Sequence, residues 1–160
     1  MKQATAAGEA AVQDMTTPSS FAALECRVGL GRVSVATNAI DVLAEYAVGT
    51  RLPLTDRISY AVGVWDDEVV LSLSLTRAET AATRTTSGLL LSVPGATIRW
   101  AFEIGSPIGL VDVATLAKPQ SAATRWLRTA ILARGDAIQF VDVHALIGDL
   151  AALARDRTEQ

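Results

Sequence analysis

The sequence carries the same short pattern twice, and this repeat restricts the possible folds more than any other feature. Residues 61–75 consist of two mainly apolar runs, 61–65 and 69–75, on either side of a short polar turn. Residues 129–143 repeat the arrangement. Two short apolar-rich runs joined by a short polar turn are typical of a β-hairpin. Related segments precede the two hairpins, at 32–46 and 97–113, so the sequence predicts two similar β-rich halves in tandem.

This organisation favours a binding protein over an enzyme. A chain of 160 residues suits one compact domain or two very small ones that share a core. Polar and small residues at both ends and near residue 80 set the predicted boundaries. We expect a disordered tail at 1–20, one domain at 21–154 and a frayed end at 155–160. The domain is expected to consist of two halves, at about 21–80 and 87–150, with a linker at 76–87. Strand exchange between the halves is possible in this arrangement.

Three further elements follow from local patterns. Residues 24–36 alternate on both sides of Gly29-Leu30-Gly31, which predicts a tight opening hairpin. Residues 37–44 begin with a capping Thr or Asn and place apolar side chains at helical spacing, which predicts a short helix. Residues 145–154 have helical periodicity and predict a C-terminal helix.

Composition excludes several kinds of site. A net charge of −3 without long charged blocks removes the main electrostatic attraction for nucleic acid. Cys26 is the only cysteine and His144 the only histidine, so multi-cysteine and multi-histidine metal sites are excluded. Nucleophile-elbow and phosphate-loop motifs are absent. We expect no catalytic residues, metal or cofactor. Without a long apolar segment or signal-peptide pattern, we expect a cytoplasmic protein with no membrane insertion.

Two groups of residues leave alternatives open. The acidic cluster Asp66-Asp67-Glu68 offers carboxylates to a hard cation, but its position between two predicted strands favours a solvated turn. Trp65, Trp100 and Trp126 each adjoin a predicted strand. Each belongs either to the core, which is favoured, or to a partner surface, where tryptophan is enriched.

Taken in order, these segments resemble the CheW-like domain of chemotaxis coupling proteins over residues 24–150. The resemblance lies in the order of the whole set, because no single motif is diagnostic. The matching segments are the opening hairpin at 28–35, the short apolar helix at 39–43, Leu52-Pro53 before the first repeated hairpin, and the closing segments 126–135 and 141–146.

The resemblance implies a mainly β fold of two tandem SH3-like five-stranded β-barrels with short helices. It implies a non-catalytic adaptor that binds a chemoreceptor cytoplasmic tip, the regulatory domain of a CheA-type histidine kinase, or other CheW-like proteins. Recognition would use paired strand edges and an apolar patch with a polar rim. The partner-binding residues implied are Val64, Trp65, Asp66, Asp67, Glu68 and Arg57.

The sequence departs from the family pattern in the region expected to bind. Gly63-Val64 is kept, but an acidic turn at 65–68 replaces the family's longer Asn-x-Arg-Gly-type turn. Leu71 and Ser74 stand where a Pro and an Asp are expected. An acidic turn in place of a cationic one reverses the local potential. We therefore expect a divergent coupler that has lost one partner face.

Two other classes of function compete with the adaptor. The first is a small-ligand or peptide-binding module on an SH3-like or OB-like barrel, with Trp65 and Trp100 lining a groove. The second is an enzyme that uses the carboxylates of Asp66, Asp112 and Asp142.

The family fold also makes predictions about the core. It predicts that Val64, Leu71 and Val141 are core residues. It further predicts that Ile131→Asp unfolds the second barrel, because a buried unpaired charge is costly.

Overall fold

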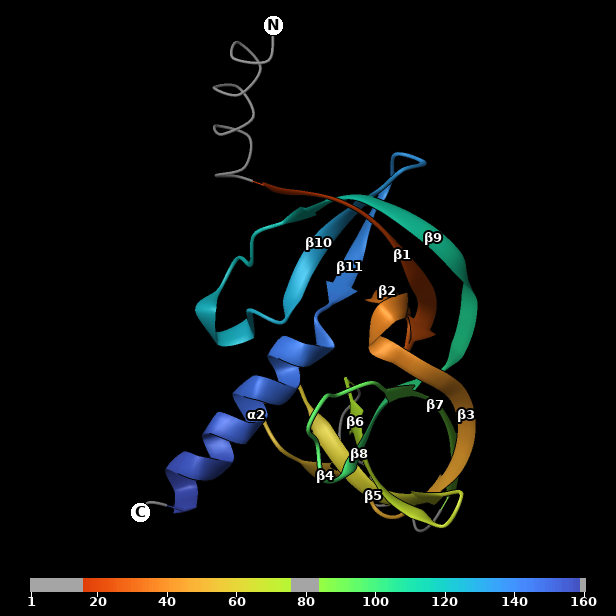
Figure 1. Cartoon of the computed structure of the whole chain (residues 1–160), viewed down its shortest axis with the longest axis vertical. Helices are drawn as coiled ribbons and strands as arrows, with labels where there is room; N and C mark the ends of the chain where they lie inside the picture. Colours follow the sequence, from red (N-terminus) through yellow and green to blue (C-terminus); the bar gives the residue numbers. More distant parts are fainter. Residues whose placement is uncertain (1–15, 76–83, 159–160) are drawn as a thin grey trace, which may run out of the picture. The chain divides into compact units, whose positions relative to one another are not determined.

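A computed structural model describes residues 16–75 and 84–158, and shows a mainly β protein (Figure 1). The first fifteen residues of the predicted tail and most of the predicted linker lie outside this description. The elements are β1 (Thr16–Val28), β2 (Gly31–Ala36), β3 (Ile40–Val48), β4 (Leu52–Pro53), β5 (Ser59–Trp65), β6 (Glu68–Ser74), β7 (Arg84–Leu91), β8 (Arg99–Ile104), β9 (Ser106–Ala117), β10 (Leu127–Leu132), β11 (Ala137–Val141), the α-helix α2 (Val143–Thr158) and 3₁₀ turns at Thr37–Ala39 and Ala122–Thr124.

Strands β1, β2, β11, β10 and β9 form a closed barrel in that order. Strands β10 and β11 are the second predicted hairpin, and they pair antiparallel. Strand β11 also pairs parallel with β2, where the Ser34 hydroxyl donates to the Gln139 carbonyl at 3.1 Å across 105 residues of sequence. This barrel therefore joins the beginning of the described chain to its end.

The other sheet has the order β3-β7-β8-β6-β5-β4. Strands β5 and β6 are the first predicted hairpin and pair antiparallel along their whole length, from Ser59↔Ser74 to Trp65↔Glu68. Strand β6 pairs parallel with β8. An additional pairing between β3 and β5 joins the two ends of the series β3-β7-β8-β6-β5, so that hydrogen bonding runs through all five strands and back to the first.

The two sets of strands have the same pairing order once their chain positions are matched. Each half of the sequence supplies a hairpin, a long strand and a second hairpin: β1-β2, β3 and β5-β6, then β7-β8, β9 and β10-β11. The first hairpin of each half pairs with the long strand and second hairpin of the other half. The halves therefore exchange hairpins. The two compact units are accordingly discontinuous: residues up to 24, 33–36 and 110–160 in one, and residues 25–32 and 37–109 in the other.

Each unit has its own apolar core. In the unit that contains β10 and β11, the Phe21 and Phe140 rings meet edge to face with centroids 5.5 Å apart. The buried residues of this core are Ala23, Val113, Leu116, Ala130, Leu132, Ile138 and Phe140. The core of the other unit consists of Tyr46, Val48, Ala61, Val70, Leu90 and Ala101.

A buried polar network lies in the unit that contains β8. The Glu103 carboxylate, 4% exposed, accepts from the guanidinium of Arg51, itself 6% exposed, and from Arg84 Nη2 at 3.1 Å. The Thr86 hydroxyl donates to the same oxygen at 3.1 Å, and the Ser72 hydroxyl donates to the other at 2.9 Å. Two guanidinium groups thus share one buried carboxylate.

Tyr46 extends this network. Its hydroxyl lies 2.8 Å from the Ser72 hydroxyl, which has already given its only proton to Glu103. The Tyr46 hydroxyl therefore donates to Ser72. Burial raises the pKa of Tyr46 well above its usual range, which keeps this donor protonated. The ring lies against Gly88, where any Cβ would overlap the tyrosine hydroxyl, so this strand position requires glycine.

Cys26 fills the interior, as the sequence indicates. Its side chain on β1 is fully buried. Burial raises the pKa of the thiol to about 11, and the neighbouring Glu25 carboxylate adds to the shift. The thiol therefore stays protonated at neutral pH and is a poor nucleophile.

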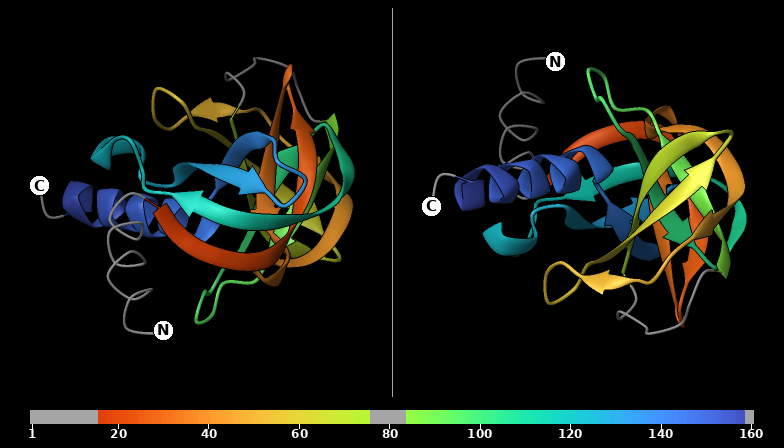
Figure 2. Two further views of the ribbon diagram at one scale, coloured as in Figure 1. Left: turned by 90° about the horizontal axis from the view of Figure 1, so that it is seen from above. Right: turned by 90° about the horizontal axis from the view of Figure 1, so that it is seen from below.

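The short helix predicted at 37–44 is wrong. A 3₁₀ turn covers Thr37–Ala39, and strand β3 begins at Ile40. The segment pairs with β7 from Ile40↔Leu91 to Val48↔Arg84, and these hydrogen bonds outweigh a weak helical pattern. At the other end of the chain, α2 runs from Val143 to Thr158 and is longer than predicted (Figure 2). Strand β1 begins at Thr16, within the predicted tail.

The predicted core assignments are correct in part. Val141 is fully buried, whereas Val64 is 54% exposed and Leu71 is half-buried. Ile131 is 37% exposed, because Ala130 and Leu132 on either side of it face the core. The alternation was predicted with the wrong register. Apolar residues occupy both faces of these strands, so hydrophobicity alone does not identify the inner face.

Candidate interaction surface

The β5–β6 turn is a two-residue hairpin loop with unusual backbone geometry. Asp66 and Asp67 have φ values of 49° and 62°, both in the left-handed region, and both side chains are exposed. Two successive positive φ angles are typical of a type I′ turn, whose twist matches that of the flanking strands. Aspartate tolerates this conformation better than most residues, although glycine suits it best. The acidic turn predicted from sequence is therefore a solvent-exposed two-residue turn.

We expect Asp67→Gly to raise the free energy of unfolding by about 0.5–1 kcal/mol, because glycine removes the steric cost of a left-handed residue. Urea denaturation of the full chain measures the change. Asp67→Ala is the matched control, because it removes the same charge but keeps a Cβ at the same φ. Equal stability of the glycine and alanine variants would contradict the turn geometry.

The outer face of the β5–β6 hairpin is apolar and exposed. Val62, Val64 and Val69 are 55%, 54% and 55% exposed, and Val64 lies directly opposite Val69. Leu71 lies opposite Val62, and Leu52 on β4, 47% exposed, pairs with the neighbouring Tyr60. Alternation along the strands places these side chains on one face. We call this set, Leu52, Val62, Val64, Val69 and Leu71, the apolar face.

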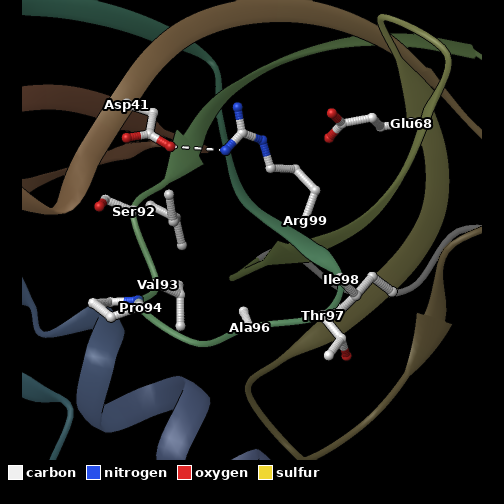
Figure 3. A pocket seen from close by; sticks show the side chains of 10 residues that line it. Asp41, Glu68, Ser92, Val93, Pro94, Ala96, Thr97, Ile98 and Arg99 are labelled. Atoms are coloured by element: carbon white, nitrogen blue, oxygen red, sulfur yellow. Dashed lines mark hydrogen bonds and ion pairs between the residues drawn. The ribbon is translucent and has the colours of Figure 1, made fainter.

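The opposite side of the hairpin carries charged and aromatic groups. Trp65 is half-buried, and the Arg99 guanidinium carbon lies 5.7 Å from its ring centroid. Arg99 Nη1 also donates to the Asp41 carboxylate at 2.8 Å. Figure 3 shows the Arg99 guanidinium between the carboxylates of Asp41 and Glu68, above the loop at 92–98. Asp41, Glu68, Arg99 and residues of this loop line a cavity of about 300 Å³.

Five of the six predicted partner-binding residues lie together, and Arg57 does not. Val64, Trp65 and the acidic turn occupy one end of the hairpin. Arg57 lies just before the other end of β5, and a strand of seven residues spans roughly 20 Å. Its backbone N–H donates to the Thr55 hydroxyl at 3.2 Å, within the β4–β5 connection. A single partner contact at the turn would therefore leave Arg57 outside it.

Sequence reasoning missed most of the apolar face. Leu52, Val62 and Val69 were not among the predicted site residues, although they are as exposed as Val64 or nearly so. The available signal was that residues 61–64 and 69–71 lack polar side chains at successive positions, whereas a half-exposed strand usually alternates apolar with polar residues. A strand that is apolar on both faces presents one of them to a second layer or to a partner.

Two residues of the competing enzyme hypothesis, Asp142 and Asp112, make structural hydrogen bonds. Asp142 caps helix α2, because its carboxylate accepts from the Ala145 backbone N–H at 3.1 Å. Asp112 accepts through its backbone carbonyl from Ala133 on the β9–β10 side of the barrel. His144 is exposed in the first turn of α2. Within residues 16–75 and 84–158, no group of three or more His, Cys, Asp or Glu is placed to hold a metal ion.

No protein-family model matches this sequence, and curated proteins give no significant match. The part of the chain that the structure describes contains no helix with the length and apolar character needed to cross a membrane. A functional proposal therefore depends on the geometry of the apolar face, the acidic turn and the adjoining cavity.

Proposed function

We propose that this protein is a non-catalytic cytoplasmic adaptor of a chemosensory array, built from two tandem SH3-like barrels of the CheW-like kind. The matched strand orders of the two units support the tandem arrangement, because each unit contains one long strand and two hairpins. Its partners are a chemoreceptor cytoplasmic tip, a CheA-type histidine kinase regulatory domain or another CheW-like protein.

The apolar face is the observation that carries this proposal. Three valines more than half exposed on two paired strands form a contiguous patch, and such patches on small proteins mark interaction sites. Exposed acidic residues at the turn give this patch a polar rim, which is the usual anatomy of a protein interface. An adaptor needs a partner surface of this kind and no catalytic group.

The charge of the β5–β6 turn distinguishes this protein from the family pattern. Family members carry a cationic turn at this place, and Asp66 and Asp67 reverse its charge. A partner surface complementary to a cationic turn is repelled by an acidic one. We therefore expect one of the two usual array partners to bind and the other to bind weakly or not at all.

Val64→Lys is expected to weaken binding of the retained partner by about tenfold or more, because it places a charge within an apolar contact. Folding is retained, since Val64 is 54% exposed. Calorimetric titration against the receptor tip and the kinase regulatory domain of the same organism measures the affinities. Ile131→Lys is the matched control, because it adds the same charge to an exposed apolar strand position of the other unit.

The alternative is a small-ligand or peptide-binding barrel, and the cavity of about 300 Å³ beside Trp65 favours it. If neither array partner binds, the adaptor proposal fails and this alternative takes its place. A change of tryptophan fluorescence with added small molecules then identifies the ligand class, since Trp65 stacks with Arg99, which lines the cavity.

A further inference from the structure

We propose that the cavity beside the β5–β6 turn binds a basic side chain, lysine or arginine, presented by a protein partner. This inference rests on the proposed adaptor function and specifies the chemistry of its partner. The cavity has charged groups on one side and apolar groups on the other. The residues that matter are Asp41, Glu68, Val93, Pro94, Ile98 and Arg99.

The carboxylates that line the cavity outnumber its cationic groups by one. The Arg99 guanidinium already has partners, because it donates to the Asp41 carboxylate at 2.8 Å and stacks over the Trp65 ring. Glu68 is exposed and makes no ion pair with any residue in the described ranges. Asp66 and Asp67 precede it in the turn. In the cavity lining one guanidinium thus faces two carboxylates, and the adjoining turn adds two exposed negative charges, which together attract cations and repel anions.

The shape and lining suit a long basic side chain. A volume of about 300 Å³ is at the lower end for ligand pockets and exceeds what one side chain needs. Val93, Pro94 and Ile98 supply an apolar wall along the loop at 92–98, opposite the carboxylates (Figure 3). Lysine and arginine combine an apolar stem with a charged head, so each part meets a matching surface.

The apolar wall is fixed before any ligand arrives. The Ser92 backbone N–H donates to the Ala39 carbonyl at 2.9 Å, which anchors the loop to the end of the 3₁₀ turn. The Ala96 N–H donates to the Val93 carbonyl at 3.2 Å, and Gly95 has a φ of 76° that closes this turn. A preformed wall lowers the ordering cost of binding.

A protein partner is favoured over a free small cation because of what surrounds the cavity. Glu68 is adjacent in sequence to Val69, whose side chain belongs to the apolar face on the other side of the strand. A partner seated on the apolar face therefore reaches the cavity around the end of the hairpin, at the β5–β6 turn. Its basic residue gains charge complementarity there, while the apolar face supplies the area of contact.

The test uses the full chain and n-butylammonium chloride, which carries the head and stem of lysine. We expect saturable NMR shifts at the backbone amides of Thr97 and Ile98 and at the Trp65 indole. Glu68→Gln weakens this binding about three- to tenfold, as expected for loss of one exposed charge partner. Glu45→Gln is the matched control, because Glu45 is an exposed strand carboxylate that does not line the cavity. Neutral n-butanol leaves these signals unchanged.

A second titration separates this inference from the adaptor proposal. The array partner that binds the wild-type chain is titrated against Glu68→Gln and Glu45→Gln. Weaker binding of the Glu68 variant alone supports the cavity as the site of a basic partner residue. Array-partner binding that is the same for both variants, or an absence of butylammonium shifts, overturns the inference and leaves the adaptor standing. Butylammonium binding without any array partner supports the cavity chemistry and overturns the adaptor.

Discussion

Replacing Glu103 by alanine is expected to lower the free energy of unfolding by about 3–5 kcal/mol, the cost of leaving a buried charge without its partner. Glu103 accepts from Arg51, Arg84, Thr86 and Ser72, and it is 4% exposed. Its removal leaves the Arg51 guanidinium, 95% buried as a side chain, without the carboxylate that offsets its charge. The Arg84 guanidinium is affected less, because 28% of its side chain is exposed and water can hydrate it.

Urea denaturation of three variants identifies the cause of the loss. Arg84→Ala keeps the Arg51–Glu103 pair and is expected to cost about 1 kcal/mol, as a partly exposed ion pair does. The double variant Arg51→Met with Glu103→Leu removes both buried charges together and is expected to recover most of the stability lost in Glu103→Ala. If the double variant is no more stable than Glu103→Ala, the unpaired charge of Arg51 is not the cause of the loss.

The local elements of this fold were predictable because their signals are local. Each repeated hairpin has two short apolar-rich runs and a polar turn within about fifteen residues, and both pair as predicted. The opening hairpin is equally local, with Gly29 at a φ of 59°. The acidic turn could also be placed from sequence, since Asp66 and Asp67 lie between two clear strands.

The pairing between halves was not predictable in the same way. Strand β2 pairs parallel with β11, and Ser34 meets Gln139 across 105 residues. No local pattern encodes such a contact, and parallel pairing needs a long crossover. Residues 37–44 show the same effect on a smaller scale. Their helical spacing is weak, and pairing with β7, more than forty residues away, makes them part of a strand.

The candidate site was predictable at its turn and not at its cavity. Trp65 and the acidic residues belong to one hairpin, so their proximity follows from sequence. The cavity depends on Arg99 meeting Asp41 across 58 residues and on the path of the loop at 92–98. Arg57 is the converse case, because it is close to Val64 in sequence yet lies at the far end of an extended strand.

The second large effect on stability concerns the β10–β11 hairpin, whose register decides which side chains of β10 face the core. Leu132→Asp is expected to abolish cooperative unfolding of the unit that contains β10, because Leu132 is 2% exposed and packs in its core. An unpaired carboxylate there costs several kcal/mol beyond the lost apolar contact, which is comparable to the whole stability of a small domain. The neighbouring Ile131→Asp is expected to cost only about 1–2 kcal/mol, since Ile131 is 37% exposed and a carboxylate there stays hydrated.

Thermal unfolding followed by near-ultraviolet circular dichroism distinguishes the two registers. The paired variants differ by one position and carry the same substitution, so local charge and β-propensity are nearly matched. Loss of the transition in Leu132→Asp with its retention in Ile131→Asp is the result expected from the pairing Ala130↔Ile138, which places Ala130 and Leu132 inward. The opposite result would return Ile131 to the core and shift the whole strand by one residue. Such a shift would also exchange the inner and outer faces, because strand side chains alternate with a period of two.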